Sequence, residues 1–151
     1  MPMTTKDFLR QVAELVRFQV PPGFQEFETV GPWGGLVKFH FGEPRIHYEV
    51  WVQRRHKVVE LGLHFESKPE TNIHYLKELT AHFEDIRSAL GQQVEAEQWT
   101  SRWTRIHQSI ALETLDEDLM WEVASQTSRM IGVLEPLVRE ASKTIKVPAD
   151  F

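Results

Sequence analysis

Three histidines, His40, His47 and His64, are the residues of this chain whose types and spacing best suit chemistry. Each lies on the polar side of a segment in which apolar and polar residues alternate. If these segments pair as neighbouring strands, the imidazoles form one row across a sheet, and Glu26 extends that row beside His40. Imidazole and carboxylate groups bind zinc, iron or copper, and an ion with an open position can activate water. Parallel side chains converge poorly on one ion, so the alternative is a set of histidines that merely share a polar face.

Alternation with a period of two residues predicts the strands that carry these histidines. The apolar positions fall on one side of each segment, which is typical of strands with one face in a core. Four consecutive strands are predicted, at residues 24–30, 36–41, 45–53 and 58–66.

Two turns set the register of the central hairpins. A turn at residues 43–44 pairs His40 with His47, and a turn at residues 55–56, or a looser four-residue loop, pairs His47 with His64. Two opposite-charge pairs support this register, because they were not used to choose it: Lys38 with Glu49, and Arg45 with Glu66.

Helices are predicted around this unit from apolar residues spaced three and four apart. The first begins at Thr4, with Asp7 in its first turn, and ends before Pro21. The second runs from Pro69 to a stop at Gly91, with Ser67 or Thr71 as its cap.

Two more strands, at residues 93–99 and 103–110, precede a last helix. A turn between them pairs Glu97 with Arg105. The last helix begins at a capping box from Thr114 to Glu117, and Pro136 is expected to kink or split it. The order helix, four strands, helix, two strands, helix predicts one α+β domain over residues 1–151, with an antiparallel sheet and helices on one face.

Composition limits the classes of partner. A net charge of −5 disfavours broad binding to phosphate backbones, and the basic residues 54–57 are interpreted as a solvated hairpin tip. The chain has no cysteine, no secretory signal and no apolar run that could span a membrane. We therefore expect a cytoplasmic protein that binds neither membrane nor nucleic acid.

An apolar group lies further along the polar sheet face. Leu36 faces Trp51, Trp51 faces Glu60, and Val58 lies nearby. Such a group on a polar face is usually covered, either by a helix of the same chain or by a partner, because tryptophan is a common interface anchor. The hypothesis of a partner includes a second copy of the chain.

Residues from Glu49 to about Val138 resemble an uncharacterised bacterial domain family, found alone or appended to restriction-type nucleases. The resemblance rests on residues 59–61 in a strand, a helix ending at residues 90–91, Glu97 and Trp99 in a strand, and residues 134–136 in the last helix. It implies no established activity, cofactor or catalytic residue. The element order is also similar to that of small acidic secretion chaperones.

These observations favour a non-enzymatic module that acts through protein contact, most simply as a homodimer, and that needs no cofactor. Its contact surface is expected on the apolar group around Trp51 or on the last helix. One alternative is a metal-dependent enzyme with the three histidines as ligands and Glu26 or Glu49 as base. The other is an accessory domain of a nuclease or restriction system. No motif in the sequence identifies a reaction.

Overall fold

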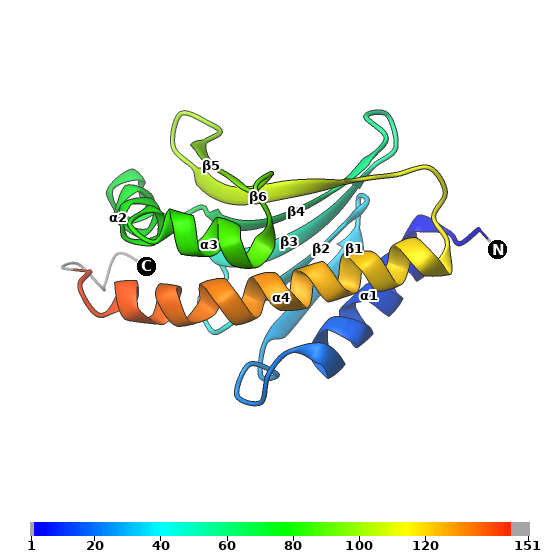
Figure 1. Cartoon of the computed structure of the whole chain (residues 1–151), viewed down its shortest axis with the longest axis horizontal. Coiled ribbons are helices and arrows are strands. Elements are labelled where there is room, and N and C mark those ends of the chain that lie inside the picture. Colours follow the sequence, from blue (N-terminus) through cyan, green and yellow to red (C-terminus); the bar gives the residue numbers. More distant parts are fainter. Residues whose placement is uncertain (1, 146–151) are drawn as a thin grey trace.

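The computed structural model describes residues 2–145 of the chain. In Figure 1, α1, α3 and α4 lie on one side of a twisted sheet and α2 lies at one end of it, so the predicted α+β class is confirmed. The elements of the described part are α1 (Thr5–Gln19), β1 (Glu28–Trp33), β2 (Leu36–His40), β3 (Ile46–Gln53), β4 (Val58–Phe65), α2 (Pro69–Thr80), α3 (Phe83–Leu90), β5 (Glu95–Gln98), β6 (Thr104–Ala111) and α4 (Glu117–Ser142).

The strands form one antiparallel sheet in the order β1-β2-β3-β4-β6-β5. The registers predicted for the two central hairpins are confirmed, since His40 pairs with His47 and His47 pairs with His64. The β3–β4 connection is the looser loop of four residues, and Lys57 at its end has a φ of 56°. The register of the β5–β6 hairpin is also as predicted.

The first strand lies further along the chain than predicted. β1 begins at Glu28 and continues to Trp33, three residues beyond the predicted end at residue 30. Only Gly34 and Gly35 remain as the turn, and their φ angles of 58° and 80° are the positive values that a two-residue hairpin turn requires.

The helix predicted from Pro69 to Gly91 is two helices. α2 ends at Thr80, and α3 begins after His82, whose φ of −110° and ψ of 22° lie outside the helical region. The apolar spacing continues across the break, which explains the error: Leu79 and Ile86 are both buried in the core, although they belong to different helices. The residue before α2 is Lys68, so neither predicted cap occupies that position.

The other two helices begin with side-chain caps. Thr4 Oγ1 accepts a hydrogen bond of 3.1 Å from the backbone N–H of Asp7, as predicted. α4 is capped by Asp116, whose Oδ1 accepts a bond of 2.9 Å from the N–H of Leu119, so the capping box predicted at Thr114 is wrong.

Pro136 does not split α4, which continues to Ser142. The proline is exposed, while Leu134, Glu135 and Val138 beside it are buried. Burial of these neighbours holds the helix together across the missing backbone donor.

The core lies between the inner face of the sheet and the helices. Inward side chains on the three central strands are fully or almost fully buried, among them Val50, Leu61 and Leu63. No helix among residues 2–145 is both long enough and apolar enough to cross a membrane.

Candidate functional site

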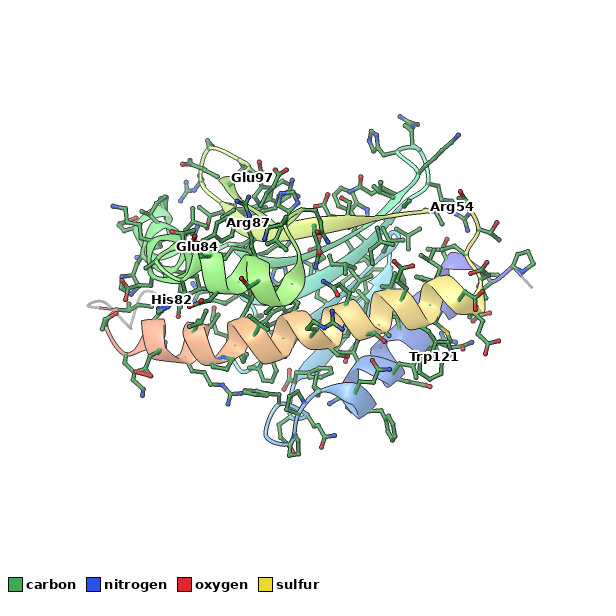
Figure 2. All side chains as sticks on the ribbon, viewed as in Figure 1. Arg54, His82, Glu84, Arg87, Glu97 and Trp121 are labelled. Atoms are coloured by element: carbon green, nitrogen blue, oxygen red, sulfur yellow. The ribbon has the colours of Figure 1, made fainter. Side chains whose placement is uncertain are left out.

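The sheet face turned away from α1, α3 and α4, here called the outer face, carries a row of polar side chains. The residues of this row pair with one another from strand to strand. They are His40, His47, His64, Arg105 and Glu97. Figure 2 shows Glu97 on this side of the sheet, above α3. The predicted alignment of the three histidines across β2, β3 and β4 is therefore present.

Two of these histidines belong to a compact group, here called the His–Glu cluster: His47, Glu49, His64 and Glu66. One ligand atom from each of the four residues lies within 4.8 Å of each of the others. His47 Nε2 lies 3.3 Å from Glu49 Oε1 and 3.8 Å from Glu66 Oε2, and His64 Nδ1 lies 3.3 Å from Glu66 Oε2. Ligand atoms placed tetrahedrally around a zinc ion lie about 3.4 Å apart, so these separations are close to those of a metal site.

The cluster is largely removed from water. The side chains of His47 and His64 are each 2% exposed, that of Glu49 is 8% exposed, and Glu66 is the most accessible at 15%. The two imidazole rings are stacked, with centroids 5.5 Å apart and an angle of 6° between their planes. Trp99 from the β5–β6 hairpin contacts the His64 ring edge-on at 5.4 Å.

The orientation of His47 is fixed by the backbone. Its Nδ1 lies 3.0 Å from the carbonyl oxygen of Pro44. A carbonyl only accepts hydrogen bonds, so Nδ1 carries a proton and donates it. Nε2 then faces Glu49 in one of two states: unprotonated, with its lone pair toward the carboxylate, or protonated, as a second N–H donor. A lone pair 3.3 Å from a carboxylate oxygen is favourable only if a cation lies between them.

His64 has an unsatisfied nitrogen. Its Nδ1 is buried and makes no hydrogen bond to any residue in the described range, although Glu66 Oε2 is close by. His40 Nδ1 and both ring nitrogens of His107 are unpaired in the same way, so the nitrogen of His64 is open to a ligand role but does not by itself identify one.

Gly62 makes room for His64. A Cβ at this position would lie 3.2 Å from His64 Nε2, 3.0 Å from the Cβ of His107 and 3.3 Å from the carbonyl oxygen of Ile106. The absence of a side chain on this residue of β4 allows the imidazole to lean across the strand toward Glu49, which pairs with Gly62.

The electrostatics of Glu49 reflect its neighbours. Burial raises the pKa of this carboxyl group, but the hydrogen bond from His47 and the charges of His64, His47 and Lys38 outweigh that effect. The net result is a pKa below the usual value, so the Glu49 carboxyl group is ionised at neutral pH.

A second cluster of charged side chains, formed by Glu60, Glu97, Arg105 and His107, lies on β4, β5 and β6. His107 Nε2 and Arg105 Nη2 approach the same oxygen of Glu97, at 3.0 Å and 2.7 Å, and Arg105 also bonds Glu60. Burial and then the charge of Arg105 lower the pKa of His107, while the hydrogen bond from Arg105 is the largest cause of the lowered pKa of Glu97. The Arg105 guanidinium group therefore supplies a positive charge to the carboxylates of both Glu60 and Glu97.

The structure does not bring all the predicted metal ligands together. His40 lies in the row, but its Nε2 is 3.6 Å from Glu28, and Glu28 rather than Glu26 is its strand partner. Glu26 precedes β1 and is exposed, so its predicted place beside His40 is wrong. Glu49, considered above as the catalytic base of a metal enzyme, belongs to the His–Glu cluster and is therefore a candidate ligand.

Glu66 was not predicted as a ligand. The sequence feature that indicates this role is the position of Glu66 two residues after His64, because residues two apart lie on the same face of an extended segment. Its backbone N–H donates to the carbonyl of Arg45, which extends the β3–β4 pairing beyond Phe65. The sequence register paired Glu66 with Arg45, and this concealed its nearness to the histidines.

The predicted contact surface also lies on the outer face. Leu36 pairs with Trp51, and Trp51 pairs with Glu60, as expected. Leu36, Trp51 and Val58 are half-buried, while Glu60 is bound by Arg105. In Figure 1, none of the helices in the described part of the chain covers this face.

Of the basic residues in the β3–β4 loop, Arg54 is hydrogen-bonded to α1 and the other three are exposed. Arg54 donates from Nε and Nη2 to the hydroxyl of Thr5 at the start of α1, at 3.1 Å and 2.9 Å, and Figure 2 places Arg54 near that end of the helix. Arg55, His56 and Lys57 are exposed. The interpretation as a solvated tip agrees with this arrangement.

Comparison of the chain with protein-family models and with curated proteins found no match, so the resemblance to the nuclease-associated domain family stays a prediction.

Proposed function

We propose that this protein binds a divalent transition-metal ion through the His–Glu cluster. The observation that carries the proposal is the orientation of His47. Its Nδ1 donates to the carbonyl of Pro44, which leaves Nε2 facing the carboxylate of Glu49 at 3.3 Å. Ligating histidines characteristically donate their other ring nitrogen to a carbonyl or carboxylate in this way.

The donor set selects the class of metal. Two imidazoles and two carboxylates suit zinc, iron, nickel or cobalt, whereas magnesium and calcium prefer oxygen ligands throughout. His64, with its unsatisfied Nδ1, supplies the second imidazole. Glu66 is the most exposed member, so an ion can enter from its side.

A metal titration tests the proposal directly. The protein is stripped with EDTA, and binding of Zn²⁺ is then measured by calorimetry and binding of Co²⁺ by its visible spectrum. We expect one ion per chain and little heat with Mg²⁺. Zinc at 100 times its Kd should stabilise the fold by about 2.7 kcal/mol.

Histidine variants provide the matched comparison. His47→Ala and His64→Ala should each weaken zinc binding by about 100-fold or more, because each removes one ligand. His40→Ala removes the same type of side chain from the same row but outside the cluster, and should leave the affinity unchanged. Absence of binding, or equal losses in all three variants, would refute the proposal. Two imidazolium ions paired with carboxylates would then be the remaining explanation of the geometry.

A second candidate function is self-association through the outer face. It is favoured by one observation: the half-buried group of Leu36, Trp51 and Val58 lies where none of the described helices covers it. Light scattering of the native protein and of Trp51→Ser tests this. A dimer that dissociates in Trp51→Ser but persists in Trp121→Ser, on α4 (Figure 2), supports the hypothesis. A monomeric native protein contradicts it.

A further inference from the structure

A groove of about 440 Å³ lies between α1 and β1, the strand at one edge of the sheet. In Figure 1, β1 and α1 lie side by side, and Arg17 of the helix bonds Thr29 of the strand. The groove, here called the α1–β1 groove, is lined mainly by charged side chains of the helix and by the end of the strand: Lys6, Arg10, Glu14, Arg17, Pro32 and Trp33. Its volume lies within the range of pockets that bind small molecules.

Three cations line the groove from one face of α1. Lys6, Arg10 and Arg17 are spaced by four and seven residues, so they project from the same side of the helix. Because an α-helix rises 1.5 Å per residue, the three side chains are distributed over about 16 Å. Such a row selects an anion only if carboxylates of the chain do not already neutralise it.

The Arg17 guanidinium group is held by neutral partners. Its Nη1 donates to the carbonyl oxygen of Gln25 at 2.6 Å, and its Nη2 donates to the hydroxyl of Thr29 at 3.1 Å. Its central carbon lies 4.1 Å from the ring centroid of Phe27. These partners fix the orientation of Arg17 but carry no negative charge, so its positive charge remains uncompensated.

The other two cations are also open to a ligand. Lys6 is exposed and makes no ion pair with any residue in the range 2–145. Arg10 Nη1 lies 3.8 Å from Asp7 Oδ1, and both side chains are more than half exposed. A long ion pair in contact with water is weak, so Arg10 can exchange it for a stronger acceptor.

The nearby carboxylates do not cancel this charge. Glu14 is the only carboxylate among the described residues that line the groove. Glu28 precedes Thr29 on β1, but its side chain lies on the outer face, where its Oε2 is 3.6 Å from His40 Nε2. The lining therefore carries three positive charges and one negative charge, in a protein whose total charge is −5.

An exposed aromatic ring adjoins these cations. Trp33 is 62% exposed and lies beside Pro32 in the lining. It is the last residue of β1, and its pairing with Leu36 anchors its backbone. The face of a tryptophan ring accepts a stacked planar group, so Trp33 offers a platform next to the positive charges.

We infer that the α1–β1 groove binds a small aromatic ligand that carries a phosphate group, of the class of a nucleoside monophosphate. The phosphate bonds Lys6 and Arg10, and the planar base stacks on Trp33. A phosphate monoester carries a charge of about −1.5 to −2 at neutral pH, which complements the excess of positive charge in the lining. Guanidinium groups bind phosphate oxygens through paired hydrogen bonds.

Three probes separate the two contributions. The protein is stripped of metal with EDTA, freed of EDTA and titrated with AMP, adenosine or inorganic phosphate, while amide chemical shifts are followed by NMR. Because no metal is present, the result is independent of the proposed metal site. We expect AMP to shift the amides of residues 6–17, 29–31 and 33, and to bind about tenfold more tightly than either adenosine or phosphate. Equal binding of adenosine, or shifts confined to other regions, would overturn the inference.

A single strand of eight deoxyadenosines distinguishes a free nucleotide from a nucleic acid. Its phosphates are diesters with one negative charge each, so they complement the lining less well than a monoester does. The strand should bind no more tightly per nucleotide than AMP. Tighter binding would overturn the assignment to a free nucleotide.

Charge variants test the phosphate contact. Arg10→Gln should weaken AMP binding about tenfold. Lys77→Gln removes an exposed cation from α2, away from the groove, and should leave the affinity unchanged. Arg10 is exposed, so its variant should fold, and circular dichroism verifies this; Lys6→Gln replaces it otherwise. Unchanged affinity in the folded variant would contradict the assignment.

Tryptophan variants test the stacking contact. Trp33→Ala should weaken AMP binding about tenfold and leave phosphate binding unchanged, because only the base contacts the ring. Trp103→Ala, which removes a partly exposed ring beside the opposite edge of the sheet, should change neither affinity. Equal losses of AMP and phosphate binding in Trp33→Ala, or no loss of either, would show that the ring is not the platform.

Discussion

Gly62→Ala is expected to destabilise this protein, although alanine normally suits a strand better than glycine. The gain from reduced chain entropy is about 0.5–1 kcal/mol. The added Cβ would lie 3.0 Å from the Cβ of His107 and 3.2 Å from His64 Nε2. These contacts are too close, and relief of such overpacking costs about 1–3 kcal/mol. The net expectation is a loss of about 1 kcal/mol, which corresponds to a fall of about 3 °C in the melting temperature of a domain of this size.

Gly132→Ala is the matched control. Gly132 lies within α4, and a Cβ there would approach Pro21 at 3.5 Å, an ordinary van der Waals distance. Here the entropy gain is not opposed, so the variant should be more stable by about 0.5–1 kcal/mol. The same substitution therefore has opposite signs at the two positions.

Urea unfolding and differential scanning calorimetry measure both variants. Gly62→Ala should also weaken zinc binding by about tenfold, because His64 must move away from the ligand position. A Gly62→Ala protein that is more stable than the native chain would refute this reasoning, because the His64 imidazole would then not need the space that glycine leaves at residue 62.

Three further predictions concern the buried polar groups and a helix end. Tyr48→Phe removes the hydroxyl that donates to buried Glu135, and urea unfolding should show a loss of about 1–3 kcal/mol. Burial raises the pKa of Glu135 in the folded protein, so its contribution to stability is present below the ordinary carboxyl pKa and is lost as pH rises through the folded value. The stability of Glu135→Gln relative to the native chain should therefore improve as pH rises across that window, and an unchanged difference would contradict the raised pKa. Thr4→Ala removes the cap that accepts the N–H of Asp7 and should cost about 1 kcal/mol in thermal unfolding.

The registers of the central hairpins could be predicted because apolar alternation and turn position constrain each other. A slip of one residue would turn Val50 and Leu61 toward solvent, so only one register buries every apolar side chain. The first strand lacked this constraint. Its segment alternates weakly, and the two-residue turn at Gly34 and Gly35 shifted Glu28 into the place predicted for Glu26.

The remaining features depend on tertiary packing that periodicity does not report. Glu135 follows Leu134 on α4, and nothing in the sequence distinguishes a carboxylate that meets Tyr48 from one that faces water. The role of Gly62 likewise appears only when His64 and His107 are placed on either side of it. In each case a long-range contact decides the role of a residue whose local context is unremarkable.

The His–Glu cluster has a consequence for stability that separates a ligand site from a structural network. Burying ionised groups is costly, and replacement of a buried charged group by apolar residues of similar volume is often neutral or stabilising by about 1–4 kcal/mol. We therefore expect the metal-free triple variant His47→Leu/Glu49→Met/His64→Leu to be at least as stable as the metal-free native chain, because these three side chains are all buried. Glu66, which is partly exposed, can remain solvated.

Zinc should reverse this order, since it stabilises only the native chain. Urea unfolding of both proteins, with EDTA and with saturating zinc, gives the four free energies that are needed. If the triple variant without metal is less stable by more than about 2 kcal/mol, the cluster is a hydrogen-bond network that the fold requires. The two histidines and the carboxylates would then be explained without a ligand, and the case for a metal at this face would lose its physical basis.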